Sequence, residues 1–273
     1  MSSGASGIDA RKVAVFRRAV WKYWKEHGRH ELPWRKTVDP YRILVSEVML
    51  QQTQVPRVIE KYKEFLRAFP NVRTLARADL SHVLRVWSGL GYNRRAKFLH
   101  EAARAIVMRH RGAVPRELSA LRALPGFGPY TAAAVRVFAF NEPDVLLETN
   151  VRTAVIHHFF ADADDIHDKQ VAPIAAAAAR GQDPRQWHSA LFDYGVYLKA
   201  THGNASRKSA HYVRQSTFDG SLRQVRGAVL KTLAAGNPVS SLSARFGDRL
   251  EQALSSLATE GLIVRAGRGW RLP

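Results

Sequence analysis

The stretch "LPGFGPYTAAAV", Leu124 to Val135, decides the fold. Gly126 and Gly128 are separated by one residue, which lets the backbone turn tightly and approach a ligand closely. A helix is expected from about Pro129, and the free amides at its N-terminus would suit a phosphate. Taken alone, a Gly-x-Gly before a helix is more typical of a simple turn between two helices. Its meaning therefore depends on the rest of the chain.

The rest of the chain is strongly basic. Its 273 residues include 42 Lys plus Arg against 23 Asp plus Glu, which gives a formal net charge of +19. This excess favours a polyanionic partner, with nucleic acid ahead of a membrane surface, although a smaller excess could serve solubility alone. Hydrophobic residues make up 46%, which is enough for one large or two smaller domains with their own cores.

Several chemistries and locations are excluded by what the sequence lacks. With no cysteine there can be no disulfide, thiolate-bound zinc, cysteine-ligated iron-sulfur cluster or cysteine nucleophile. The start "MSSGASGIDA" has no charged and apolar regions of a signal peptide, and the apolar run "VAPIAAAAA" is far too short to span a membrane. We expect a cytoplasmic, nucleoid-associated monomer with no membrane partner.

Helical periodicity dominates most of the chain and indicates an all-α fold of many short helices. The helices are expected after Asp9 as far as Gly28, and at 41–51, 57–68, 79–88, 94–110, 129–140, 150–160, 168–180 and 184–199. The polar stretch 199–221 lacks this period and is expected to be a connection. After it, three short helices and two strands about a Gly turn predict a small winged helix-turn-helix domain at 218–273. Either duplex contact through the wing or plain domain packing would fit.

A second unusual stretch is "SEVMLQQTQV", Ser46 to Val55. It puts the single carboxylate of Glu47 into an apolar helix and follows it with three glutamines. A surface helix has little use for neutral amides packed around apolar residues, although such amides can hydrogen-bond to a partner without requiring one charge state.

Four segments together carry a family resemblance, namely "LPWRKTVDPYRILVSEVMLQQTQV", "WSGLGYNRRAKFLHEAA", "LPGFGPYTAAAV" and "LLETNVRTAV". Their order and spacing resemble those of the helix-hairpin-helix DNA glycosylases, most closely the MutY-type adenine glycosylases, over about residues 11 to 215. The resemblance implies a glycosylase domain at 1–215, made of two helical subdomains with the active site in the cleft between them. It also implies a hairpin that grips phosphate through Leu124, Gly126, Gly128 and Thr131, often with a monovalent cation.

The resemblance implies a role for each matching residue. Gln51 and Gln52 would form a wedge beside the flipped nucleotide, and Tyr92 would insert near the opposite base; without this context they would be exposed amides and a core aromatic. Glu47 would protonate the leaving purine, since a carboxyl in an apolar pocket can carry a proton near neutral pH. Its structural alternative is an ion pair with Arg35 or Arg42, and Arg35 matches a pocket-lining position.

The sequence also departs from the family pattern. Glu148 replaces the family Asp that faces the developing oxocarbenium ion, so the catalytic geometry or the activity must differ, and Asn150 would orient this carboxylate or the sugar phosphate. Tyr130 replaces the lysine of bifunctional relatives and cannot form a Schiff base, so base removal without efficient strand cleavage is expected. The four cluster cysteines of many relatives are replaced by Lys199, Ser206, Ser209 and Gln215.

No cofactor is therefore expected beyond a possible monovalent cation at the hairpin, and no metal site, because the acidic stretch "ADADDIHD" lacks the pattern of a calcium loop. The expected activity is monofunctional removal of a mispaired base, with adenine opposite guanine or 8-oxoguanine as the leading substrate. Thymine or uracil opposite guanine, or another damaged base, is the alternative. A lesion-binding protein without catalysis and a transcription regulator built on the winged domain also remain open.

Overall fold

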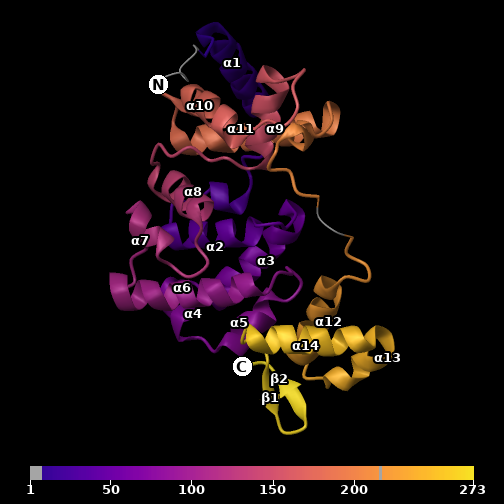
Figure 1. Ribbon diagram of the computed structural model, residues 1–273. Coiled ribbons are helices and arrows are strands. Elements are labelled where there is room, and N and C mark those ends of the chain that lie inside the picture. Colours follow the sequence, from indigo (N-terminus) through magenta and orange to yellow (C-terminus); the bar gives the residue numbers. More distant parts are fainter. Residues whose placement is uncertain (1–7, 215–216) are drawn as a thin grey trace, which may run out of the picture. The chain divides into compact units, whose positions relative to one another are not determined.

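The chain divides into two compact units. The structure, a computed structural model, describes residues 8–214 and 217–273 (Figure 1). One unit combines Met1–Val38 with Ala132–Arg214, and the other combines Asp39–Thr131 with Gln215–Pro273. The described residues are mostly helical and form one small sheet, which agrees with the all-α prediction. The predicted boundary between 1–215 and 218–273 falls where residues 215 and 216 lie outside the described residues, and it stays a prediction.

The first unit is built from helices of both chain segments. They are α1 (Ala10–His27), the larger part of α8 (Pro129–Phe140), α9 (Thr149–Phe159), α10 (Asp168–Ala179) and α11 (Pro184–Thr201), with the 3-10 turns η1 (Pro33–Arg35) and η2 (Ala205–Lys208). Helix α9 packs along α11 and α1 packs against both α10 and α11. Their apolar faces enclose a core in which the rings of Phe16 and Trp187 meet edge to face at 6.2 Å.

Aspartates start the first and last of these helices. The Asp9 carboxylate accepts from the backbone N–H of Arg11 at 2.8 Å, and the Asp183 carboxylate accepts from that of Gln186 at 2.8 Å. A carboxylate at this position satisfies amides that have no partner within the helix. Pro184 fits the first turn of α11, where its missing N–H costs nothing. These signals explain why both helices begin where the sequence predicts.

The second unit begins with six helices. They are α2 (Pro40–Leu50), α3 (Val55–Ala68), α4 (Val72–Arg77), α5 (Leu80–Trp87), α6 (Arg94–His110) and α7 (Leu118–Arg122). Helix α6 packs against α2, α4 and α5, around the fully buried side chains of Phe65, Trp87 and Leu99. The sequence did not predict α4 and α7, because six and five residues are too few to display a helical period.

Residues 217–273, here named the C-terminal module, complete the second unit. They form α12 (Leu222–Ala234), η3 (Val239–Leu242), α13 (Ser243–Phe246), α14 (Asp248–Thr259) and the antiparallel strands β1 (Val264–Ala266) and β2 (Gly269–Arg271). Helix α12 lies beside α14 and packs against α5 (Figure 1). The order of helices and hairpin is the expected one, while a winged DNA-binding role stays a prediction.

The stretch 199–221 is more structured than a plain connection, so that prediction is wrong for its first half. Helix α11 continues to Thr201, and η2 follows directly. Ser206 and Ser209 are buried; the Ser206 hydroxyl donates to the Asn204 side chain at 2.6 Å, and Ser209 forms a β-bridge with Ile166. Side-chain hydrogen bonds of this kind leave no periodic trace in the sequence. The related position Gln215 lies outside the described residues.

Candidate catalytic residues and nucleic-acid interface

Glu47 lies in the buried half of α2. The helix begins at Asp39, whose side chain accepts from the backbone N–H of Tyr41 at 2.8 Å. Glu47 is only 8% exposed and its neighbours Val48 and Met49 are buried. Burying a carboxylate is costly, so a Glu is seldom kept at such a position unless it is paired or has a chemical role. Arg42, an alternative partner in the sequence, is exposed in the first turn of the same helix.

Arg95 joins the end of α2 to the loop that carries Tyr92. Its guanidinium is buried and donates to the carbonyl oxygens of Val48 at 2.8 Å, Met49 at 2.9 Å and Gln51 at 2.5 Å, and also to that of Gly91 at 3.1 Å. Burial lowers the pKa of Arg95 to about 10, so the group stays charged at neutral pH. One side chain therefore fixes both segments that the sequence predicts as a wedge.

The two proposed wedge residues Gln52 and Tyr92 share an unusual backbone conformation. Gln52 has φ 54° and Tyr92 has φ 46°, both in the left-handed region that disfavours side chains larger than glycine. Strained residues persist only where the surrounding structure holds them, and they are common at functional sites. Here the carbonyl oxygens around them are held by Arg95, which is the restraint that such strain requires.

The hairpin is connected to the glutamine segment by a side-chain hydrogen bond. Gln51 Nε2 donates to the hydroxyl of Thr131, which is buried in the first turn of α8, at 3.1 Å. The wedge and the hairpin thus hold each other in place, which the sequence did not predict. Tyr130, the neighbour of Thr131, is partly buried in the same turn.

The two hairpin glycines have different surroundings. Gly126 has φ 77°, and a Cβ there would lie 2.5 Å from the Cβ of Phe98. Gly128 has no atom within 4 Å of its Cβ direction and is exposed. Leu124, at the start of the turn, has a buried side chain that anchors it in the core. Gly126 is therefore required by packing, whereas Gly128 leaves the backbone open to an approaching group.

Glu148 is the N-cap of α9 in the first unit. Its carboxylate accepts from the backbone N–H of Asn150 at 2.8 Å and of Val151 at 3.0 Å, and from the Asn150 side-chain amide at 3.1 Å. Removal from water raises the pKa of Glu148, while these N–H groups and the charge of Arg152 oppose the rise. The carboxylate is thus held by three donors of its own helix.

Gly195 of α11 allows this arrangement. A Cβ at Gly195 would lie 2.2 Å from the carbonyl oxygen of Asn150. Helix α11 can therefore approach the start of α9 only because position 195 has no side chain. Nothing in the sequence pattern marks Gly195, which sits inside a helix in "DYGVY".

Arg35 has a structural role within the first unit. Its guanidinium donates to both carboxylate oxygens of the buried Asp193, at 2.7 Å and 3.0 Å, and to the carbonyl oxygen of Ser189 at 3.2 Å. It also lies 4.9 Å from the centre of the Trp24 ring. Burial by itself would raise the pKa of Asp193, but the hydrogen bonds and positive charge of Arg35, together with the hydrogen bonds from Arg29, hold this pKa below its ordinary value. A DNA-binding role for Arg35 stays a prediction.

The acidic stretch 161–168 agrees with the expected solvated loop. Asp162, Asp164 and Asp165 are exposed, and Asp168 pairs with Arg152 at 2.7 Å at the start of α10. Among the residues that the structure describes, no group of three or more His, Asp or Glu could hold a metal ion. Across the same residues no helix is long and apolar enough to cross a membrane.

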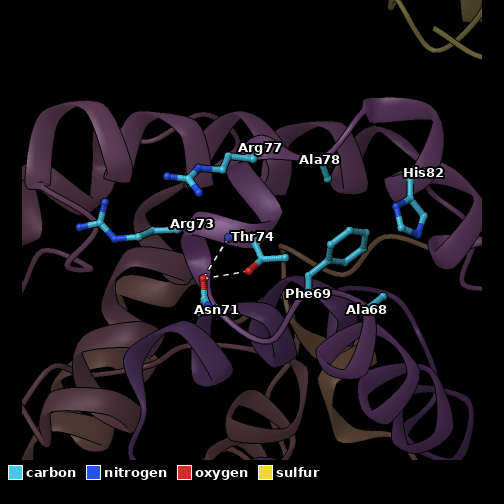
Figure 2. Close-up of a pocket in the computed structure, with 8 residues that line it drawn as sticks. All are labelled: Ala68, Phe69, Asn71, Arg73, Thr74, Arg77, Ala78 and His82. Carbon is cyan, nitrogen blue, oxygen red and sulfur yellow. Dashed lines mark hydrogen bonds between the residues drawn. The ribbon is translucent and has the colours of Figure 1, made fainter.

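An open pocket of about 500 Å³ in the second unit contains none of the residues named by the sequence motifs. Its lining comes from the end of α3, α4 and the start of α5. Figure 2 shows the Asn71 side chain turned toward Thr74, whose backbone N–H and hydroxyl donate to it at 2.9 Å and 3.1 Å. Asn71 is thus occupied as the N-cap of α4, which gives this lining residue a structural role.

Comparison with known proteins adds to this geometry. Residues 45–177 match the family model described as HhH-GPD superfamily base excision DNA repair protein. The adenine DNA glycosylase of Mycobacterium tuberculosis is 33% identical over 272 residues, covering 90% of each chain. The thymine/uracil-DNA glycosylase of Pyrobaculum aerophilum is 37% identical over 146 residues, covering 53% of this chain and 62% of its own.

A solved structure shows the same fold. The structure of a thermostable thymine-DNA glycosylase superposes with a TM-score of 0.63 at 28% identity, covering 72% of this chain and 92% of the other. The family match at residues 45–177 includes Glu47, the Tyr92 loop, the hairpin and the start of α9. The chain therefore belongs to the HhH-GPD superfamily of base excision DNA repair proteins and is a helix-hairpin-helix DNA glycosylase.

Proposed function

We propose that this glycosylase removes adenine mispaired with guanine or 8-oxoguanine in double-stranded DNA and leaves the strand intact. The observation that carries the proposal is the buried Glu47, which lies one helical turn before the glutamine segment. Arg95 holds this segment and the Tyr92 loop, in which Gln52 and Tyr92 have strained backbone conformations. Similarity to an adenine DNA glycosylase along 90% of the chain supports the choice of base.

Glu47 acts as the general acid. Adenine is a poor leaving group as an anion, so protonation of a ring nitrogen must accompany cleavage of its bond to the sugar. The bonding electron pair then stays on the neutral purine, and an oxocarbenium ion forms at the sugar. A water molecule adds its oxygen to that carbon and gives up a proton to the carboxylate that Glu47 has become. The products are free adenine and an abasic site.

Glu148 supplies negative charge for the oxocarbenium ion. A fixed charge placed where positive charge develops stabilises the transition state without any rearrangement during the reaction. The three N–H donors at the start of α9 fix the orientation of this carboxylate, and Asn150 supplies two of them. The longer Glu side chain is thus accommodated by an N-cap geometry that orients it.

Binding relies on the hairpin and on the positive charge of the chain. The exposed backbone at Gly128 and Pro129 suits a DNA phosphate at the N-terminus of α8. The net charge of +19 gives a salt-dependent affinity for duplex DNA. Tyr130 stands where a Schiff-base lysine would be needed for strand cleavage, so the product is an intact strand with an abasic site.

Thymine or uracil opposite guanine is the second candidate, since relatives named for those bases match half or more of the chain. A panel of duplexes with adenine, thymine or uracil opposite guanine, 8-oxoguanine or cytosine separates the two. Single-turnover assays with the full chain should release adenine fastest opposite guanine or 8-oxoguanine, with strand breaks only after alkali. Faster release of thymine or uracil would overturn the adenine assignment.

A further inference from the structure

Arg223 of the C-terminal module contacts the tip of the Tyr92 side chain. Its Nη1 donates to the Tyr92 hydroxyl at 2.7 Å, and the guanidinium carbon lies 5.7 Å from the centre of the Tyr92 ring. The same guanidinium lies 5.4 Å from the centre of the Phe218 ring. A hydrogen bond from a charged donor to a tyrosine hydroxyl, combined with a cation–π contact to the ring, fixes the orientation of the side chain.

The module is held on this surface at a second point. Lys97 of α6 donates to the carbonyl oxygen of Glu260 at 2.5 Å. Glu260 in turn accepts from Arg226 of α12 at 2.6 Å, so the helix that carries Arg223 is tied to the anchor at Lys97. Helix α12 also packs against α5. The packing of the C-terminal module on this surface therefore places Arg223 against Tyr92.

Tyr92 is restrained at both of its ends. Arg95 holds the surrounding carbonyl oxygens, lies 5.5 Å from the ring centre and keeps the backbone at its positive φ. Arg223 holds the hydroxyl. With both ends restrained, the ring keeps one orientation before DNA arrives, which lowers the cost of ordering it on binding.

We propose that Arg223 is a positioning residue that fixes Tyr92 for insertion beside the base opposite the target, so that the C-terminal module sets the choice of opposite base. The inference rests on the proposed wedge role of Tyr92. It assigns to the module a part in recognition that involves no base contact of its own. The hydroxyl of Tyr92, and not only its ring, then matters for selectivity.

A double-mutant cycle tests the contact. The wild type, Arg223→Ala, Tyr92→Phe and the double variant are compared in single-turnover release of adenine opposite 8-oxoguanine and opposite cytosine. Each single substitution should lower the preference between these opposite bases about tenfold, which is the scale of one hydrogen bond to a charged group. The double variant should lose no more than either single variant, because both remove the same contact.

A matched control and a second readout make the test decisive. Arg245→Ala removes another arginine of the module, 5.0 Å from the ring centre of Phe246, and should leave the preference unchanged. Fluorescence of 2-aminopurine at the target position reports extrusion of the base without bond cleavage. The double-mutant cycle can therefore be measured even if the wild type releases another base or no base. Such a result would contradict the proposed function but not this inference. Additive losses, an unchanged preference in Arg223→Ala, or faster extrusion in that variant would overturn the inference.

Discussion

The side-chain amide of Asn150 donates to the Glu148 carboxylate at 3.1 Å, two residues along the same helix start. The backbone N–H of Asn150 donates to the other carboxylate oxygen at 2.8 Å. Ser, Thr, Asp and Asn are the usual N-cap residues, and the longer Glu148 fills this position here by accepting from the backbone N–H groups of Asn150 and Val151. The glutamate at position 148 is thus accommodated by the local structure of α9.

Glu148 should be required for activity and costly for stability. Its raised pKa means that the folded state favours the protonated carboxyl, so its contribution to stability is lost as pH rises above the ordinary value of 4.5 through the raised one. Glu148→Gln should therefore melt at a higher temperature than the wild type at neutral pH, with the difference shrinking in acid, while excision is abolished. Thermal melting across pH checks the sign. A glutamine variant that is less stable at neutral pH would show that the charged N-cap outweighs burial.

Gly195→Ala should disturb the start of α9. Its Cβ would meet the Asn150 carbonyl oxygen at 2.2 Å, so the helices must separate at a cost on the order of 2–3 kcal/mol. Gly227→Ala is the control, since Gly227 lies inside α12 with no atom near its Cβ direction; it should stabilise by about 0.5–1 kcal/mol. Urea unfolding measures both. Equal effects at the two glycines would mean that α9 and α11 do not need this close approach.

Alanine substitutions at the two hairpin glycines should have different effects, one on the stability of the fold and the other on duplex binding. Gly126→Ala places a Cβ 2.5 Å from that of Phe98 at a positive φ and should destabilise by roughly 2 kcal/mol or more. Gly128→Ala meets no atom and should change stability by less than about 0.5 kcal/mol. It should nevertheless weaken duplex binding, because its methyl group obstructs the approach of a phosphate. Full duplex affinity in Gly128→Ala would remove the hairpin from the interface.

Acid should destabilise the first unit through His188. Burial lowers its pKa to about 4, and its Nε2 contacts the Asp144 carbonyl oxygen at 3.0 Å, where only a protonated Nε2 can donate. Because the folded value is depressed, this contribution is complete above the ordinary value of 6.5 and is lost as pH falls toward 4. His188→Gln keeps a donor without titrating, so its melting temperature should fall less steeply over this range. An unchanged slope would assign the acid sensitivity to other groups, such as His158, whose pKa is also lowered to about 4.

The sequence predicts the long helices well because their helical period repeats over several turns. The ranges 94–110 and 129–140 agree with α6 and α8 at both ends. It could not distinguish Arg95 from Arg94, because the two differ only in the folded chain. There Arg95 is buried, while Arg94 is exposed, with its guanidinium carbon 5.1 Å from the centre of the Phe98 ring. Gly195 and Arg223 act on residues far away in the sequence, and no spacing rule connects such pairs. The residues that orient the proposed catalytic groups therefore could not be predicted from the sequence.

Glu47→Gln gives the most direct test of the account. The amide has nearly the same shape but no acidic proton, so duplex affinity should be retained while single-turnover release of adenine opposite 8-oxoguanine falls by about 100-fold or more, the usual size of general acid catalysis. Thermal melting confirms that the variant is folded. Wild-type release of adenine by Glu47→Gln would exclude Glu47 as the proton donor and contradict the proposed mechanism.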